Sequence, residues 1–327
     1  MGKGSGDGSG HCRAFSIATA CPVAMQEEDP RTFQATTTLL PGDSGNMRAM
    51  SVETANTAPP VVTAGDTVDE IVARSQRRGR AFPIRRTFLQ SPSPDGEGVV
   101  GGPLGRLIAA GDRRGLILYL LLVTKASSHP WNSHLPASVW ARALGLELPN
   151  SKTAASTVSK LWLRLEGHRL IRRGRVQRMA DVTLLREDGS GAEYTAPGAV
   201  GDHYLQVPLA LWGEGPGEDQ RWYQVLTLPE LAVMLIGRSM GDDFRMPFEM
   251  GPDWYGISAD TIGRGVAGLR RRGLLTVSQT FKKAPLSAVG YTAEHHYTLQ
   301  PPFGPMGRRS SSAPRHLGRP LNREGPP

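Results

Sequence analysis

The segment from residue 258 to 272 places hydroxyl and guanidinium groups where a helix could present them. Ser258 suits a helix N-cap, because its hydroxyl can accept from the free N–H groups of the first turn. Ile262, Val266 and Leu269 follow at i, i+4 and i+7, a spacing that predicts a core-facing stripe. The remaining face is then free to carry chemistry.

On that outer face, Arg264 could donate two hydrogen bonds to a guanine edge, and Thr261 could bond a base or a phosphate. Asp260, near the helix N-terminus, either stabilises the helix dipole or accepts from a cytosine amine; we favour the dipole. Gly265 and Gly268 are also expected outside, where small residues would let the helix approach another surface closely.

A second segment repeats this plan 104 residues earlier, without a gap. Thr157 aligns with Thr261, Lys160 aligns with Arg264, and the apolar positions agree as well. Most amphipathic helices with basic outer faces are merely solvated, so the repetition is what favours a binding role. The outward candidates of this first segment are Lys152, Thr153, Ser156, Thr157, Lys160 and Arg164.

Basic side chains are dense where each of these helices ends and a strand is expected. Such positions suit phosphate contacts, which orient a protein on a duplex without reading its sequence. The candidates are Arg172, Arg173, Arg175 and Arg178 in the first copy, and Arg270, Arg271, Arg272, Lys282 and Lys283 in the second. By strand alternation, Arg172 and Arg178 share one face and Arg173 and Arg175 the other, so at least one face should meet solvent or phosphate.

Each segment lies within a series of expected elements, defined by apolar periodicity and turn residues. The first series has helices over 104–110, 116–125, 136–144 and 151–167, then strands over 171–178, 182–186 and 192–195. The second has helices over 228–239, 248–255 and 258–272, then strands over 274–282 and 291–299.

The second segment resembles winged-helix regulators, in which a Ser-x-x-Thr helix is followed by Leu-x-x-x-Gly-Leu-Leu. The matching residues are Trp254, Tyr255, Gly256, Ile257, Ser258, Thr261, Ile262, Arg264, Gly265, Leu269, Gly273, Leu274 and Leu275. The tandem arrangement also resembles plasmid replication initiators with two winged-helix domains. The likeness covers about residues 103–300 and implies a mainly α fold with small β-hairpin wings (α+β). Two departures are the glycines of the second helix and the long region 197–220.

These expectations divide the chain into five parts. They are a largely disordered region 1–100 with one short helix over 66–77, a winged-helix domain 103–196, a linker 197–222, a second winged-helix domain 223–300, and a disordered basic tail 301–327. The net charge of +8 follows this division, with −1 over 1–100, +5 over 101–300 and +4 over 301–327. A basic folded region attracts polyanions, either a phosphate backbone or an anionic membrane.

Several other function classes lack their motifs. The sequence contains no GxxxxGK[ST] phosphate loop and no HExxH, and adjacent His295 and His296 would point to opposite faces of a strand. Cys12 and Cys21 form no CxxC, which fits a reducing cytoplasm. The longest apolar run, Leu116 to Val123, is far short of the roughly 20 residues of a spanning helix. We therefore expect a cytoplasmic non-enzyme without cofactor, metal or membrane contact.

The resulting hypothesis is sequence-specific binding of double-stranded DNA by two reading helices, in transcriptional control. The alternatives are a replication initiator of a plasmid or integrated mobile element, with replisome partners, and a winged-helix scaffold that binds protein. The outer faces differ at Ser156 against Asp260 and at Arg164 against Gly268, which predicts an asymmetric target. The sequence does not define the oligomeric state.

Overall fold

The computed structural model describes residues 60–75, 77, 79–93, 95–146, 151–177 and 179–304. Expectations on residues 1–59 and 305–327, on Arg178 and on the side chain of Lys152 lie outside the described residues. The described ranges form a mixed structure of helices and strands. No helix in these ranges is both long and apolar enough to cross a membrane.

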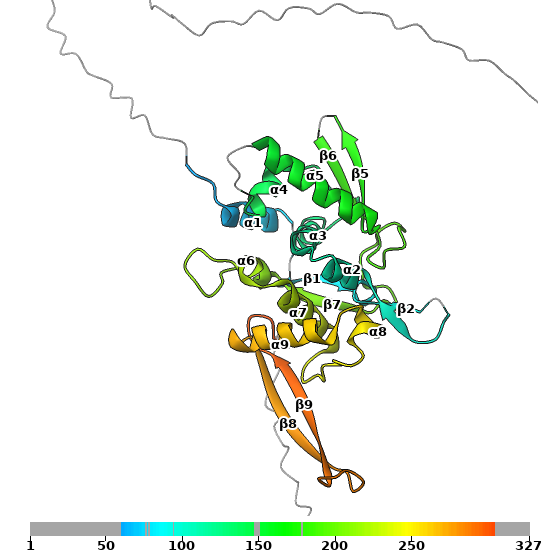
Figure 1. The fold of residues 1–327 in the computed structure, drawn as a ribbon. Coiled ribbons are helices and arrows are strands. Elements are labelled where there is room, and N and C mark those ends of the chain that lie inside the picture. The colour runs from blue at the N-terminus through cyan, green and yellow to red at the C-terminus, as the bar shows by residue number, and fades with distance from the viewer. Residues whose placement is uncertain are drawn as a thin grey trace, which may run out of the picture. The chain divides into compact units, whose positions relative to one another are not determined.

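The first series of elements contains helix α5, which lies next to α4 and β5 (Figure 1). In chain order it comprises α2 (Pro103–Ala109), α3 (Arg113–Lys125), β4 (Asn132–Ser133), α4 (Ala137–Ala143), α5 (Ser151–Gly167), β5 (Ile171–Val176) and β6 (Met179–Leu184). The strands form an antiparallel sheet in the order β4-β6-β5. The helices expected here are confirmed within three residues at each end, but the strand expected over 192–195 is only an isolated bridge, Leu185 to Glu193.

The second series surrounds helix α9 and follows the same order. It comprises α7 (Leu228–Met240), α8 (Gly251–Tyr255), α9 (Ala259–Arg271), β8 (Leu275–Lys283) and β9 (Tyr291–Leu299). Between α7 and α8, Phe244 forms an isolated antiparallel bridge to Tyr297 of β9, at the place that β4 takes in the first series. Both series therefore run helix, short strand pairing, two helices and hairpin.

The helix before the short strand pairing in each series, α3 or α7, begins at a side chain that caps it. Asp112 precedes α3 and accepts from the Gly115 N–H at 2.9 Å. Thr227 precedes α7, and its reciprocal hydrogen bonds with Glu230 form a capping box. These caps fix where the two central helices start, and both acidic residues reappear at the candidate site.

The segments before and between the two series are part of the fold. Helix α1 (Ala64–Ala73) covers most of the helix expected over 66–77. Strand β1 (Ala81–Arg85) pairs antiparallel with β7 (Tyr204–Pro208), and Phe82, Ile84, Leu205 and Val207 are buried. The smaller elements are η1 (Arg86–Phe88), β2 (Gln90–Pro92), β3 (Val99–Gly101), η2 (Leu209–Trp212) and α6 (Trp222–Val225).

Three of the expected divisions therefore need correction. Residues 60–100 were expected to hold little beyond one helix, and 197–222 to be a linker, yet both regions supply buried strands to one hydrophobic core. The physical reason is that such a two-stranded pairing becomes stable only when it packs against helices, as β7 does against α7, and local composition does not reveal this packing. The tail expected from 301 also begins later, because Phe303 is buried and lies 5.7 Å from the ring of Trp222.

A buried arginine joins the N-terminal strand to the end of the first series. The Arg85 side chain is 2% exposed and donates to Glu187 (2.7 Å) and to Asp202 (3.0 Å). It also donates to the carbonyl and the hydroxyl oxygen of Thr195, both at 2.9 Å. Burial raises the pKa of Glu187, and the Arg85 guanidinium opposes that shift.

Candidate nucleic-acid interface

Helix α9 is oriented by its cap and its apolar stripe. The Thr261 backbone N–H donates to the Ser258 hydroxyl at 3.2 Å, so Ser258 is the N-cap that the sequence predicts. Ile262, Val266 and Leu269 are buried, with exposed fractions of 6% or less. This arrangement leaves the face with Thr261 and its neighbours toward solvent.

The glycines of α9 lie elsewhere than expected. A Cβ on Gly265 would overlap the Pro229 carbonyl oxygen and lie 2.6 Å from Val233 Cγ2 of α7. A Cβ on Gly268 would overlap the carboxylate of Glu230 and lie 2.7 Å from its Cγ. The placement of both glycines on the outer face is therefore wrong, because they are small to let α9 pack closely on α7.

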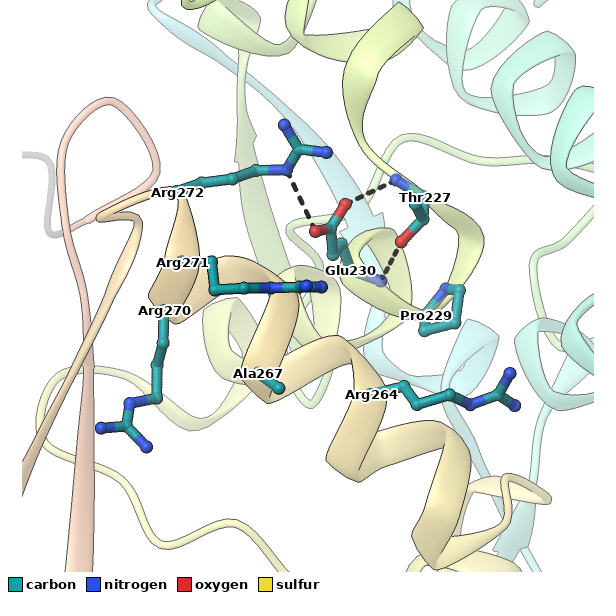
Figure 2. Close-up of a pocket in the computed structure, with 8 residues that line it drawn as sticks. All are labelled: Thr227, Pro229, Glu230, Arg264, Ala267, Arg270, Arg271 and Arg272. Carbon is teal, nitrogen blue, oxygen red and sulfur yellow. Dashed lines mark hydrogen bonds and ion pairs between the residues drawn. The ribbon is translucent and has the colours of Figure 1, made fainter.

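An open groove of about 850 Å³ lies between α9 and the start of α7 (Figure 2). Its lining residues are Thr227, Pro229, Glu230, Arg264, Ala267, Arg270, Arg271 and Arg272. Arg264, Ala267 and Arg271 follow at i, i+3 and i+7 and so share one helix face. Within the described chain, neither Arg270 nor Arg271 has an ion-pair partner. Four arginines against one carboxylate make the groove electropositive, which suits a polyanion.

Arg272 differs from the other arginines of this groove. Its Nε donates to Glu230 Oε1 at 3.0 Å and its Nη2 to the Val225 carbonyl at 2.9 Å. The Glu230 side chain is 4% exposed and also accepts from the Thr227 N–H at 2.7 Å. Arg272 thus holds the end of α9 against the start of α7, which makes it a positioning residue more than a free phosphate contact.

Arg264 remains available at the surface. Its side chain is 63% exposed, with Nε 3.1 Å from Asp260 and Nη2 donating to the Thr261 hydroxyl at 3.1 Å. An exposed pair of this kind contributes about 0–1 kcal/mol and can be exchanged for another partner. The three outward candidates Asp260, Thr261 and Arg264 therefore form one polar cluster on the first turns of α9.

Helix α5 presents a comparable outward face. Its inner residues Val158, Leu161 and Leu165 are nearly inaccessible, and Trp162 packs edge-on against Trp140 with ring centres 5.3 Å apart. The outward candidates Thr153, Ser156 and Lys160 are exposed, and Thr157 is half-buried and donates back to the Thr153 carbonyl at 3.0 Å. The exposed Leu163 (57%) lies on this side of α5 and was not singled out from the sequence.

Arg164 is held by the first turn of α3. Its Nε and Nη2 donate to the two carboxylate oxygens of Asp112, at 2.7 and 2.9 Å. Burial alone would raise the pKa of Asp112, but the hydrogen bonds from Arg164 and from Gly115 outweigh it and hold that pKa below its usual value. A bidentate arginine–carboxylate pair is strongly directional. The geometry therefore gives Arg164 a positioning role for α5, while its side chain remains 48% exposed.

Strand β5 carries exposed arginines on both of its faces. Arg172, Arg173 and Arg175 are all exposed, as expected for a strand beyond the core. Arg173 donates to Glu166 at the end of α5, with Nε 2.7 Å from Oε2. Arg172 and Arg175 are in no ion pair within the described part of the chain, so they keep a full charge for phosphate.

The β8–β9 hairpin holds the last two candidates. Lys282 lies 2.8 Å from Glu294, which also pairs with Arg245 at 2.9 Å. The hydrogen bond from Lys282, with the charges of Arg245 and Lys282, holds the pKa of Glu294 below its usual value. Lys283 is exposed and in no ion pair in the described ranges. The two lysines therefore differ in how much charge they offer.

The sequence did not single out Arg245, because it lies in a loop without periodicity and reaches Glu294 only through the fold. Arg270 was noted only as a basic neighbour, although the groove places it with Arg264 and Arg271. A spacing of six residues does not put Arg270 and Arg264 on one helix face, so the sequence offered no signal for it. In the described ranges, no three His, Cys, Asp or Glu side chains lie close enough to hold a metal ion.

Comparisons with known proteins found no relative of this chain. No family model, no curated protein and no solved structure matches this chain. What the interface binds must therefore follow from its own side chains.

Proposed function

We propose that the protein binds double-stranded DNA through helices α5 and α9, as two tandem winged-helix units. The observation that carries the proposal is the repeated order of helix, short strand pairing, two helices and hairpin, with the amphipathic α5 and α9 each just before the hairpin. In helix-turn-helix proteins the second helix of the pair enters the major groove. Here that helix has, in both copies, an outer face of hydroxyl and basic groups.

In this proposal α9 is the principal reading helix. The major groove of B-DNA is about 12 Å wide and admits one helix. Arg264 is exposed and Thr261 is half-buried on the first turns of α9, where they would meet base edges. Arg270 and Arg271 lie toward its end, where the groove beside α7 would take the phosphates of one strand.

The first winged-helix unit, with α5 and β5, would contact DNA through fewer side chains than the second. Ser156, Thr157 and Lys160 would face the bases, while Arg172 and Arg175 on β5 would contact phosphates. Arg164 is left out, because Asp112 holds its guanidinium. The two outer faces then offer different donors, which favours a target without two-fold symmetry.

Salt dependence is the primary test of the proposal. The affinity for a random-sequence duplex, measured by fluorescence anisotropy, should fall steeply as salt rises, with a log–log slope of about −0.9 per neutralised phosphate. Lys283→Ala should make that slope smaller by about one. Lys282→Ala should change it less, because Glu294 already shares the charge of Lys282. Absence of any binding at low salt would refute DNA binding and leave a protein-binding scaffold.

We further propose that the DNA is a promoter. Selection of bound duplexes from a random pool, followed by mapping the sites, separates the two biological roles. A transcriptional regulator should occupy single sites, whereas a replication initiator should occupy a repeated array. Recovery of arrays would overturn the regulatory role while leaving DNA binding intact.

A further inference from the structure

The distal end of the β8–β9 hairpin is apolar, and none of the residues that the structure describes covers it. Leu286 is 102% exposed, Val289 66%, Phe281 62% and Tyr291 49%. These residues lie at or next to the turn that joins the two strands, which extends away from the helices (Figure 1). Large apolar side chains gathered on a protruding tip indicate a binding surface.

The end of the hairpin is held in one conformation by its own contacts. The strands stay paired to their last residues, Lys283 with Tyr291, and the rings of Phe281 and Tyr291 meet edge-on at 5.2 Å. The adjoining turn closes with backbone hydrogen bonds from Ala284 to Gly290 and from Gly290 to Ser287. Leu286 thus projects from an ordered turn whose conformation need not be formed on contact.

The charge at the tip is one-sided. From Gln279 to Ala293 the only charged residues are Lys282 and Lys283. Lys282 is paired with Glu294, so two tips of identical chains would bring two lysines without an ion-pair partner in the described ranges together, Lys283 from each, which disfavours a second copy as the occupant. An apolar surface bordered by lysines instead complements a nucleic acid, with phosphates outside and stacked bases within.

We propose that this tip enters the minor groove of the bound duplex and inserts Leu286, supported by Val289, between two base pairs. The proposal rests on the DNA binding proposed above and adds a deformation of the duplex to it. Because the minor groove is about 6 Å wide, a two-stranded hairpin fits only if the groove opens. Apolar side chains achieve this in other architectures by unstacking a base step, which kinks and unwinds the duplex.

The hairpin has the length for this contact. Three residues separate the end of α9 from strand β8, which has nine residues and so reaches about 30 Å. The minor groove next to an occupied major groove lies about half a helical turn away, or about 17 Å. A helix seated in the major groove would therefore leave the tip within reach of the adjoining minor groove.

Duplex unwinding by the full-length protein tests the proposal. A closed circular plasmid is relaxed by topoisomerase I with the protein bound at low salt, and the topoisomers are resolved after deproteinisation. The wild type should shift the distribution toward negative supercoils. The double variant Leu286→Ser/Val289→Ser should lose most of that shift while binding a short duplex within a few-fold of wild type. Val200→Ser, at an equally exposed position (109%) outside the proposed interface, should keep the full shift.

The other outcomes separate the two proposals. A wild type that binds duplex but leaves the topoisomers unchanged would overturn the insertion and leave DNA binding intact, as would a double variant that shifts them fully. Failure of the wild type to bind any duplex would overturn both. Sedimentation without DNA tests whether a second copy of the chain binds the tip instead. If the wild type were a dimer and the double variant a monomer, the tip would be a dimer contact, and its insertion into DNA would be overturned. Unchanged circular dichroism melting confirms that the variants are folded.

Discussion

The paired arginines of helices α5 and α9 and of the residue after α9 are of two kinds, according to the carboxylate that each one binds. Arg164 and Arg272 each bind a nearly inaccessible carboxylate, Asp112 or Glu230, in the first turn of the neighbouring helix. Arg264 instead pairs with a residue as exposed as itself. A guanidinium bound to a buried acid cannot leave without stranding that charge, whereas an exposed one can exchange partners. Only the second kind is suited to reading bases.

Arg264→Ala should therefore change recognition without changing stability. If Arg264 bonds a base, the variant should lose about 1–3 kcal/mol of binding free energy and tolerate more sequences at one position of the selected site. Arg74→Ala is a matched control, because Arg74 is also exposed and paired with an acid one helical turn away. Selection from random duplexes measures both. An unchanged sequence preference in Arg264→Ala would reduce its role to a phosphate contact.

Asp112 should make the protein sensitive to acid. Its pKa lies below the ordinary value of 3.8 in the folded state, so the ionised form stabilises the fold above that pH, and this contribution is lost as pH falls through the lowered pKa. Asp112→Asn keeps a cap acceptor but removes the charge. Its stability should fall less than that of wild type between about pH 5 and about pH 2 in urea unfolding. Glu249→Gln, at an exposed acid, should follow the wild-type curve.

At the scale of whole elements, the sequence predicted where the helices form better than it predicted which face of each helix is buried. Apolar periodicity placed α5 and α9 closely, because the i, i+4 and i+7 residues must be buried. It misplaced Gly265 and Gly268, since a glycine has no side chain whose burial could signal a face. It also did not predict the pairing of Arg164 with Asp112, because Asp112 lies 52 positions earlier and only the packing of α5 on α3 brings them together.

The glycines of α9 should respond in opposite ways to alanine. Gly265→Ala puts a methyl group into the Pro229 carbonyl and should destabilise the protein by about 1–3 kcal/mol, because backbone cannot yield as a side chain can. Gly263→Ala meets nothing within 4 Å and should stabilise it by up to about 1 kcal/mol through helix propensity. Urea unfolding measures both. Equal effects would mean that α9 does not pack on α7 as closely as described.

At the scale of the whole molecule, the two series share one core, and the regions outside them help to complete it. Strand β1 lies about 120 residues from its partner β7, and Trp212 donates to the Thr124 hydroxyl of α3 at 3.1 Å. Such distant pairings leave no trace in local composition. The sequence therefore predicted the repeated elements well and the joining elements poorly, because short strands such as Ala81–Arg85 are recognisable only with their partner.

Arg85 is where these distant segments are joined most tightly. Arg85→Met should cost about 3–5 kcal/mol of stability, because the Glu187 carboxylate, which is inaccessible, would lose its counter-charge. The double variant Arg85→Met/Glu187→Leu should recover much of that loss, since it removes the stranded charge as well. Arg74→Met, at an exposed pair, should cost at most about 1 kcal/mol. Urea unfolding of the wild type and these three variants measures the free energies of unfolding that the comparison needs. If the double variant were no more stable than Arg85→Met, the loss would come from the contacts to Thr195 and Asp202, and the join would depend on those hydrogen bonds instead of the buried ion pair.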